Sequence, residues 1–285
     1  MKKGVWLVLP VVILALFVTV LPLVNMVYRS FQKTMFGFGK AEFIGLGNYL
    51  SLFKDGTFLP SLGRSFIWVF ENLAIQLTVP LLIALLLSGN NAFYYSMRTF
   101  ILIPWVLPMV VISIIWRWIL EPNVGILGYF LREYLRIGPI NFFGSKSLAF
   151  HTLAFINSWH FIPFGTILML AALSTVPVDL YDAAKVDGAS SWQRFVYITF
   201  PLIGRTIWFV GLLAFMWSFN SFDLIWLVTQ GGPGDTTLTL PVYIYKLAFK
   251  MYNYGKASAA SLISMAILIG VAALYFKIFS PREGA

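Results

Sequence analysis

The sequence predicts an all-α integral membrane protein with six transmembrane helices. Of its 285 residues, 59% are hydrophobic and 11% are charged, whereas about 25% of the residues in a soluble domain are charged. The apolar residues gather into segments of about 20 residues, which is the length that a helix needs to cross a bilayer. These segments lack the alternating pattern of barrel strands, and backbone groups in lipid must be hydrogen-bonded internally, so we expect helical spans.

Six apolar segments define the expected organisation. They occupy about residues 5–28, 65–88, 99–120, 148–173, 202–228 and 257–279. No polar segment exceeds a few dozen residues, so residues 1–285 are expected to form a single transmembrane domain. An even number of spans places both termini on one side of the membrane. The first segment is longer than the roughly 7–15 apolar residues of a signal peptide, and we expect it to be retained.

The basic residues argue against one class of partner and leave the orientation open. The formal net charge is +9, but the lysines and arginines are scattered through short loops, a pattern that favours contact with membrane lipid headgroups and argues against nucleic-acid binding. With the N-terminus inside, eight basic residues would face the cytoplasm and eleven the outside. Only the pair Lys2 and Lys3 favours a cytoplasmic N-terminus by the positive-inside rule.

Motifs of enzymes are missing from the sequence. No phosphate-binding GxxxxGK[ST] occurs, and the glycine-rich segment 231–237 has no lysine, so we expect neither ATP hydrolysis nor a bound cofactor in this chain. His151 and His160 belong to no HExxH motif, and the chain has no cysteine, so we expect no metal site. A nucleophile elbow is also missing. These observations predict a protein that is not an enzyme.

Polar residues within the second, fourth and fifth spans mark faces that point away from lipid. Such residues are costly at membrane depth, so they face a helix bundle or a wet cavity, although hydrogen bonding between helices explains any one of them equally well. They are Glu71, Asn72, Gln76, Asn157, Ser158, His160, Ser218, Asn220, Ser221 and Asp223. Asn220 and Asp223 fall on a separate helical face and are expected to bond a neighbouring helix.

The third span contains Pro104 and Pro108. Each proline removes an intrahelical hydrogen bond and clashes with the preceding turn, so residues 103–109 are expected to be kinked or partly unwound. Such a kink either lines a cavity or bends the helix for packing.

A polar loop, residues 174–201, separates the fourth and fifth spans. Pro177 suits a first helical position, residues 178–186 continue as a helix, and Gly188 supplies the positive φ that ends it. Ser190 and Gln193 form a capping box that opens a second short helix, and Pro201 is placed to start the fifth span. The mixed apolar and charged surface of the first helix suits a groove on a partner protein or the headgroup layer.

This loop resembles the EAA motif of permease subunits from binding-protein-dependent ABC importers. The matching residues are Asp182-Ala183-Ala184, Asp187-Gly188-Ala189, Phe195, Ile198 and Pro201. Asp182 stands where the family usually has glutamate, so the charge is kept and its reach is shorter. The resemblance implies the type I importer permease fold, with residues 174–201 as the coupling loop that contacts ATPase subunits.

Further matches lie around the fifth span. Segments 222–223, 229–233, 236–237 and 243–245 are similar to those of sugar importers of the maltose and multiple-sugar type, in particular to the first of two non-identical permeases. This resemblance implies a plasma-membrane location with cytoplasmic termini and a second permease of similar fold. It also implies two ATP-binding subunits, which hold ATP and Mg, and an extracytoplasmic sugar-binding protein.

The resemblance also implies which residues contact the substrate. They are Trp105, Met109, His160, Phe161, Phe164, Trp217, Ser218 and Ser221. Aromatic faces with a few hydrogen-bonding groups suit a sugar. The alternatives are a permease for another solute, such as glycerol phosphate or a polyamine, and a proton-coupled secondary transporter that uses Glu71 or Asp223.

Overall fold

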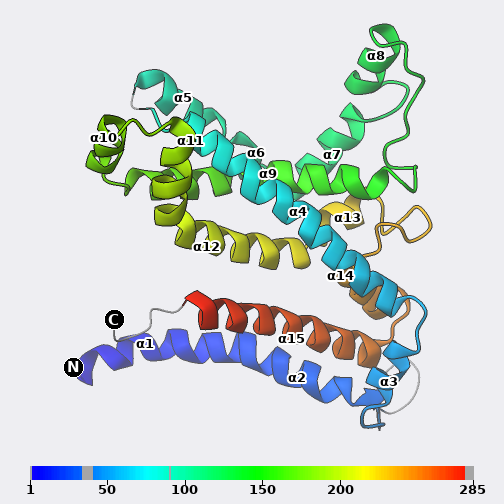
Figure 1. Ribbon diagram of the computed structural model, residues 1–285. Coiled ribbons are helices and arrows are strands. Elements are labelled where there is room, and N and C mark those ends of the chain that lie inside the picture. Colours follow the sequence, from blue (N-terminus) through cyan, green and yellow to red (C-terminus); the bar gives the residue numbers. More distant parts are fainter. Residues whose placement is uncertain (1, 34–40, 90, 280–285) are drawn as a thin grey trace. The chain divides into compact units, whose positions relative to one another are not determined.

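The computed structural model describes residues 2–33, 41–89 and 91–279 (Figure 1). Contacts within the chain divide it into two compact units. The first comprises Met1–Gly63 and Leu240–Gly270, and the second comprises Arg64–Thr239 and Val271–Ala285. Two long helices, α4 (Phe58–Leu86) and α15 (Tyr254–Phe279), continue from one unit into the other.

The described residues confirm an all-α membrane protein. Five of their helices are long and apolar enough to span a bilayer, and a bent pair of helical segments completes six. The five spans are Leu9–Ser30, Phe58–Leu86, Ala149–Ser174, Ser191–Val228 and Tyr254–Phe279. The predicted fourth span, residues 148–173, is shifted by one residue, and the predicted second span begins earlier than expected.

The first unit combines the N-terminal part of the chain with a segment close to its C-terminus. A buried amide, Asn48, ties two of its elements together, because its Nδ2 donates to the carbonyls of Ser30 and Gln32, each at 2.8 Å. Gly255 permits α15 to approach β1 (Gln32–Lys33), since a Cβ atom there would lie 2.2 Å from the Gln32 carbonyl oxygen. In chain order the elements are α1 (Lys2–Ala15), η1 (Leu16–Val20), α2 (Leu21–Ser30), β1 (Gln32–Lys33), β2 (Glu42–Phe43), α3 (Gly47–Phe53), α14 (Leu240–Tyr245) and η3 (Lys246–Lys250), with parts of α4 and α15. The strands β1 and β2 pair antiparallel, with Gln32 opposite Phe43.

The second unit is built around α4, α9 (Ala149–Ser174) and α12 (Phe200–Phe219). Its core includes Phe161, Met169, Val210 and Ala214, which are buried together. Gly165 lets α9 approach α4, because a Cβ atom would lie 3.1 Å from the ring of Pro80. The elements are most of α4, α5 (Ala92–Phe100), α6 (Ile103–Val106), α7 (Met109–Ile119), α8 (Ile126–Glu133), α9 (Ala149–Ser174), α10 (Val178–Val186), α11 (Ser191–Arg194), η2 (Phe195–Thr199), α12 (Phe200–Phe219) and α13 (Asp223–Val228), with the end of α15.

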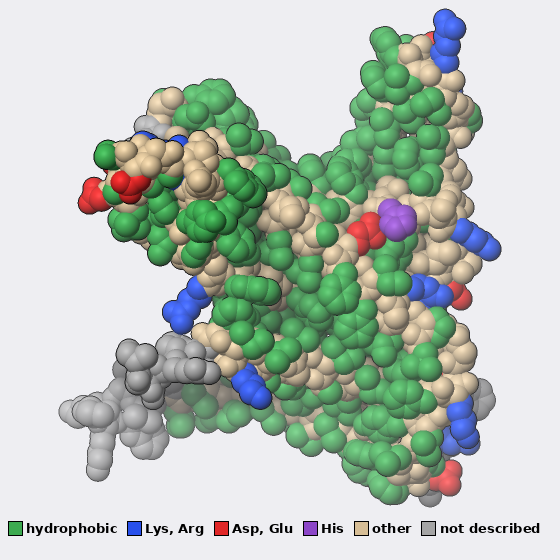
Figure 2. Space-filling view, viewed as in Figure 1, with side chains coloured by type: hydrophobic (Ala, Val, Ile, Leu, Met, Phe, Trp, Pro, Cys, Tyr) green, Lys and Arg blue, Asp and Glu red, His purple; other side chains and the backbone are tan. Residues whose placement is uncertain are grey.

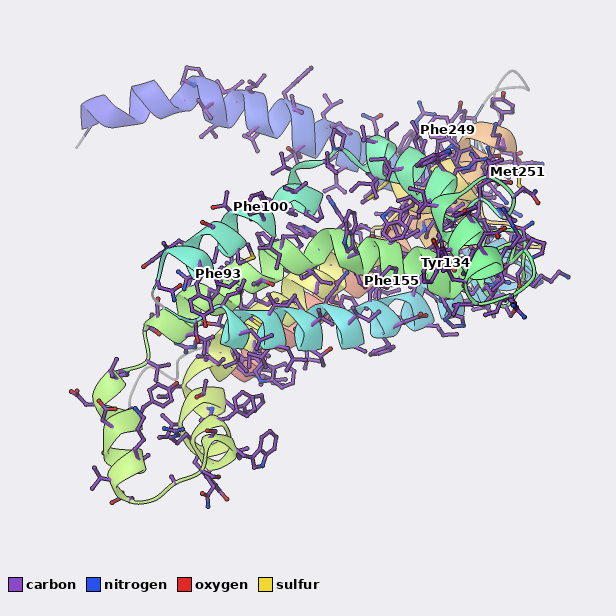
Figure 3. All side chains as sticks on the ribbon, turned by 90° about the horizontal axis from the view of Figure 1, so that it is seen from above. Phe93, Phe100, Tyr134, Phe155, Phe249 and Met251 are labelled. Atoms are coloured by element: carbon purple, nitrogen blue, oxygen red, sulfur yellow. The ribbon has the colours of Figure 1, made fainter. Side chains whose placement is uncertain are left out.

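The third span is broken, as the two prolines predict. The segment Ala92–Val106 meets Met109–Ile119 at an angle of 95°. Leu107 and Pro108 adopt extended backbone angles between α6 and α7. Figure 3 labels Phe93 and Phe100 near the two ends of α5, which precedes the break. The predicted kink over residues 103–109 is therefore confirmed.

The start of the fifth span differs from the prediction. The helix does not begin at Pro201, because it runs without a break from Ser191 through the π-helical turn η2 into α12. Proline lacks the N–H that an α-helix requires, and a π-helical turn is one way to relieve the local mismatch. Pro177 also lies one position earlier than predicted, since it precedes α10 as its N-cap residue.

Candidate substrate cavity and coupling loop

A cavity of about 270 Å³ lies within the second unit. It is bounded by residues of α4, α7, α9, α12 and α13 and of the turn between α12 and α13. Aromatic and polar side chains share its wall: Gln76, Met109, Asn157, His160, Phe161, Trp217, Ser218, Asn220, Ser221, Phe222, Asp223 and Leu224. Aromatic surface with a few amide and hydroxyl groups is typical of a site for a small polar ligand.

A histidine from α9 compensates for the break in the third span. Pro108 has no N–H, so it cannot satisfy the carbonyl of Pro104 one turn earlier. Instead, Nδ1 of His160 lies 2.8 Å from this carbonyl oxygen and can donate to it. Met109, the first residue of α7, reaches the cavity directly after the break. The break thus forms part of one wall of the cavity, and the hydrogen bond from His160 stabilises the break.

A polar network connects α4, α9 and α12 beside the cavity. Its centre is Asn72, which is 0% exposed. Its Oδ1 accepts hydrogen bonds from Asn157 Nδ2 at 2.7 Å and Ser158 Oγ at 2.9 Å. It also accepts one from Gln76 Nε2 at 3.2 Å. This single amide oxygen therefore joins side chains of two spans.

The serines of the fifth span extend the polar network. Ser218 Oγ donates to Gln76 Oε1 at 3.3 Å, and Ser221 Oγ donates to Asn157 Oδ1 at 3.3 Å. A membrane interior offers little water to buried polar groups, so each of these bonds satisfies a group that would otherwise be costly. The network comprises Asn72, Gln76, Asn157, Ser158, Ser218 and Ser221.

Four aromatic residues form a cluster next to the network. The rings of Phe164 and Trp217 are 4.9 Å apart, and those of Trp105 and Phe164 are stacked at 5.4 Å. Phe161 meets Phe164 and Trp217 edge to face at 5.7 and 5.6 Å. This aromatic cluster joins α6, α9 and α12. Trp217 lines the cavity and remains 47% exposed.

The structure brings most of the residues implied as substrate-contacting to one place. Six line the cavity: Met109, His160, Phe161, Trp217, Ser218 and Ser221. Trp105 and Phe164 lie in the aromatic cluster, outside the cavity wall. Ser218 is 1% exposed and its hydroxyl is engaged with Gln76, so it supports the wall more than it faces the lumen.

Sequence reasoning placed other lining residues differently. Gln76 and Asn157 were predicted to face inward but were not predicted to contact substrate, although both line the cavity. Asn220 was expected to bond a neighbouring helix, and instead its Nδ2 donates to the Met216 carbonyl of its own helix at 3.0 Å. Asp223 also lines the cavity. Polarity at membrane depth was the signal that could have identified all four.

The predicted coupling loop, residues 174–201, forms the two short helices that the sequence predicts. The first, α10, ends in a Schellman motif: Ala189 N donates to Ala184 O at 2.8 Å and Gly188 N to Lys185 O at 3.1 Å. Gly188 has φ +77°, the left-handed conformation that this motif requires. The capping box of Ser190 and Gln193 starts α11, as predicted.

One tyrosine fixes α10 to the rest of the second unit. Tyr181 packs against the small core formed by Ala172, Val176 and Ile203. Its hydroxyl lies 2.8 Å from Oγ1 of the buried Thr199 in η2. The coupling loop is therefore held at the end of the two spans that it connects.

Most other residues of α10 and α11 are exposed. Asp182 and Lys185 pair with each other at 2.7 Å, and Ala183 and Asp187 are exposed. Acidic side chains mark this end of the unit in Figure 2. Large apolar side chains, among them Val186 at 88% and Trp192 at 71%, are exposed beside the charges. An exposed apolar surface with charges at its margin is typical of a site that contacts another protein.

Comparison with known proteins identifies the family. A model for binding-protein-dependent transport system inner membrane components matches residues 76–283. A probable ABC transporter permease protein of Brucella suis biovar 1 (strain 1330) is 34% identical over 280 residues, which cover 98% of this chain and 96% of the relative. The trehalose/maltose transport system permease protein MalF of Thermococcus litoralis (strain ATCC 51850 / DSM 5473 / JCM 8560 / NS-C) is 29% identical over 97% of this chain and 93% of its own.

A solved structure confirms the fold. A chain of the bacterial alginate ABC transporter, in complex with an alginate pentasaccharide-bound periplasmic protein, matches with a TM-score of 0.86 and 20% sequence identity. The match covers 98% of this chain and 94% of that chain. The predicted type I permease fold is confirmed. The chain therefore belongs to the family of binding-protein-dependent transport system inner membrane components, and it is a transport permease subunit and not an enzyme.

Proposed function

We propose that this chain is the permease subunit of an ATP-driven importer for an oligosaccharide or a related carbohydrate. The observation that carries the proposal is the cavity beside the aromatic cluster, whose wall combines the partly exposed Trp217 with the amides of Gln76 and Asn157. Sugars combine apolar C–H faces with many hydroxyls, and this combination of side chains can contact both. The names of relatives agree, since one transports trehalose and maltose and another, from Streptomyces coelicolor (strain ATCC BAA-471 / A3(2) / M145), is a diacetylchitobiose uptake permease.

The coupling loop is the proposed contact with ATPase subunits. The surface formed by α10 and the turn that follows it includes the exposed Asp182, Ala183, Asp187 and Gly188 and the half-buried Ala184, and we assign this surface to a groove on an ATP-binding subunit. Two such subunits would hold ATP and Mg, because this chain has no phosphate-binding motif. Both termini are then cytoplasmic, and the opposite side faces an extracytoplasmic sugar-binding protein. A second permease of similar fold completes the pathway.

Transport in this proposal depends on the rigidity of α10. Closure of the ATPase subunits moves the coupling loop, and Tyr181 passes this motion to α12 through Thr199. A ligand shifts a conformational equilibrium only by its difference in affinity for the two states. The loop must therefore contact the two ATPase states differently.

Uptake in proteoliposomes tests the substrate assignment. The complete transporter would be reconstituted and supplied with maltose, trehalose or diacetylchitobiose. Trp217→Ala is expected to lower uptake by about fivefold, because an aromatic contact contributes about 1 kcal/mol beyond its buried area. Trp118→Ala, on an exposed part of α7, serves as the matched control. Wild-type uptake by Trp217→Ala would show that the cavity is not part of the transport pathway.

A cationic solute is the second candidate, and one observation favours it. Asp223 lines the cavity, whereas none of the described lining residues is a lysine or an arginine. A polyamine would gain from this carboxylate, and glycerol phosphate would be repelled by it. Asp223→Asn should therefore abolish uptake of spermidine and leave sugar uptake close to that of the wild type.

A further inference from the structure

A second hollow in the second unit has a different chemistry from the substrate cavity. This apolar groove of about 230 Å³ lies between α4, α12 and the last turns of α15. Four positions of α12 line it at helical spacing, Trp208, Gly211, Leu212 and Phe215, and α15 supplies a matching stripe. The polar groups in its wall belong to Trp208 and Tyr275. The groove therefore suits a hydrocarbon and not a sugar.

Aromatic side chains gather at one end of the groove. The rings of Trp208 and Phe279 are 5.3 Å apart, and those of Tyr275 and Phe279 are 5.1 Å apart. Tryptophan and tyrosine are enriched where the hydrocarbon of a bilayer meets the headgroups. This end of the groove is thus placed at the level of the lipid headgroups.

A cation lies at the same end. Arg205 is one turn before Trp208 on α12, and its Nη2 donates to the carbonyl of Phe279 at 3.4 Å. The side chain is exposed, so its remaining N–H groups are available to an anion. None of the described residues that line the groove is acidic. The charge at the mouth is therefore complementary to a phosphate.

The length of the groove matches one leaflet. From Arg205 to Phe215 the helix rises by about 15 Å, since each residue adds about 1.5 Å. This is half of the roughly 30 Å hydrocarbon thickness of a bilayer. A single acyl chain could extend along the groove from the headgroup level to the middle of the membrane.

We propose that the groove between α4, α12 and α15 binds an acyl chain of one anionic phospholipid, whose phosphate contacts Arg205. Gly211 keeps the floor open, because a Cβ atom there meets only Leu77 at 3.7 Å. A larger side chain at this position would fill the space of the acyl chain. The site is independent of the sugar pathway and of its substrate.

Native mass spectrometry of the complete transporter tests the proposal. The protein would be purified with its partner subunits and exposed to mixed micelles of phosphatidylglycerol and phosphatidylcholine. We expect retained phosphatidylglycerol on the wild type and about tenfold less on Gly211→Leu, since the leucine occupies the volume of several methylene groups. Gly204→Leu is the matched control, because nothing lies within 4 Å of a Cβ atom there. Arg205→Gln should lower the preference for phosphatidylglycerol about fivefold, the effect of one basic residue at an anionic surface.

A photoreactive benzoylphenylalanine at position 212 identifies the occupant directly. A lipid adduct on this chain supports the site. A cross-link to the second permease would show that a protein helix fills the groove, and it would overturn the proposal. Absence of any retained lipid, or equal retention by Gly211→Leu and the wild type, would overturn it as well.

Discussion

The coupling loop and the polar network obtain their hydrogen bonds in opposite ways. In the loop, the partners are near in sequence: Ser190 with Gln193, Asp182 with Lys185, and Gly188 with Lys185. In the network, Asn72 is joined to Asn157 and Ser158, which are more than 80 positions away. Hydrogen bonds between residues close in sequence make the loop rigid, so that it can move as a unit. Hydrogen bonds between residues distant in sequence connect one transmembrane span to another.

The same two regions also differ in what they expose. Four of the six network residues are buried, Asn157 and Ser221 are half-buried, and all six are hydrogen-bonded to one another, whereas the loop exposes charges and large apolar side chains together. A buried network stabilises the arrangement of spans within the chain. An exposed mixed surface contributes little to the chain itself. Changes in the loop should therefore affect transport more than stability, and changes in the network should affect stability first.

Gly188→Pro gives the largest expected effect. Proline fixes φ near −65°, whereas Gly188 has φ +77°, and it also lacks the N–H that donates to Lys185. We expect sugar uptake in proteoliposomes to fall by about tenfold or more, with normal insertion of the spans. Gly188→Asn, which tolerates the left-handed conformation, should retain most uptake. Wild-type uptake by Gly188→Pro would contradict the role of the loop.

Asn72→Leu comes next and should act on stability. It leaves the side chains of Gln76, Asn157 and Ser158 without their shared acceptor, at a cost of about 2 kcal/mol for two bonds between helices and one within α4. The thermal midpoint of the purified complex should fall by about 5 °C. The control is Asn25→Leu, because Asn25 is exposed and bonds only within its own helix in the described contacts. Equal midpoints for the two variants would mean that the network does not hold the spans together.

Tyr181→Phe examines the link between the loop and α12. It removes the hydroxyl that contacts Thr199 and keeps the packing of the ring, so the loss is about 1 kcal/mol. We expect the ratio of sugar transported to ATP hydrolysed to fall about twofold to fivefold. Tyr197→Phe is the control, since Tyr197 is 76% exposed. If both variants transport with the same ratio, the hydroxyl carries no part of the coupling.

The smallest expected effect concerns a distant bond in the first unit. Asp55 accepts a hydrogen bond from Tyr243 at 2.9 Å. Burial acts to raise the pKa of Asp55, but hydrogen bonds from Thr57 and Tyr243 and the charge of Lys256 together hold it below its usual value of 3.8. A lowered pKa stabilises the folded state above the unfolded pKa, and this contribution is lost as the pH falls through the folded pKa.

Thermal melts at different pH values measure this effect. The difference in midpoint between the wild type and Asp55→Asn should be largest at neutral pH and should shrink below about pH 4. Glu42→Gln, a change at an exposed carboxylate, should show no such trend. A difference that is constant with pH would indicate that the charge of Asp55 does not contribute.

The sequence was sufficient where structure depends on neighbours along the chain. The helix over 178–186, the left-handed Gly188, the capping box at Ser190 and the break at Pro104 and Pro108 were all predicted. Each follows from the conformational preference of one or two residues. The prediction that the fifth span begins at Pro201 was wrong, because the π-helical turn η2 lets the helix continue into this position, and no local sequence pattern indicates such a turn.

The cavity could be predicted only in part, because it depends on contacts between distant segments. Membrane-depth polarity marked Gln76 and Asn157 as inward-facing, but it could not show that they share hydrogen bonds with the fifth span. Likewise, the bond between His160 and the Pro104 carbonyl joins positions 56 residues apart. Neither spacing nor composition carries that information.

That bond between His160 and Pro104 also constrains how the permease can move. If α9 rotated or slid alone, the imidazole would leave the carbonyl, and an unpaired carbonyl within the membrane costs several kcal/mol. Helices α6 and α9 therefore move together, or another hydrogen-bond donor must replace His160. A hydroxyl group of a passing sugar is a donor of the required kind.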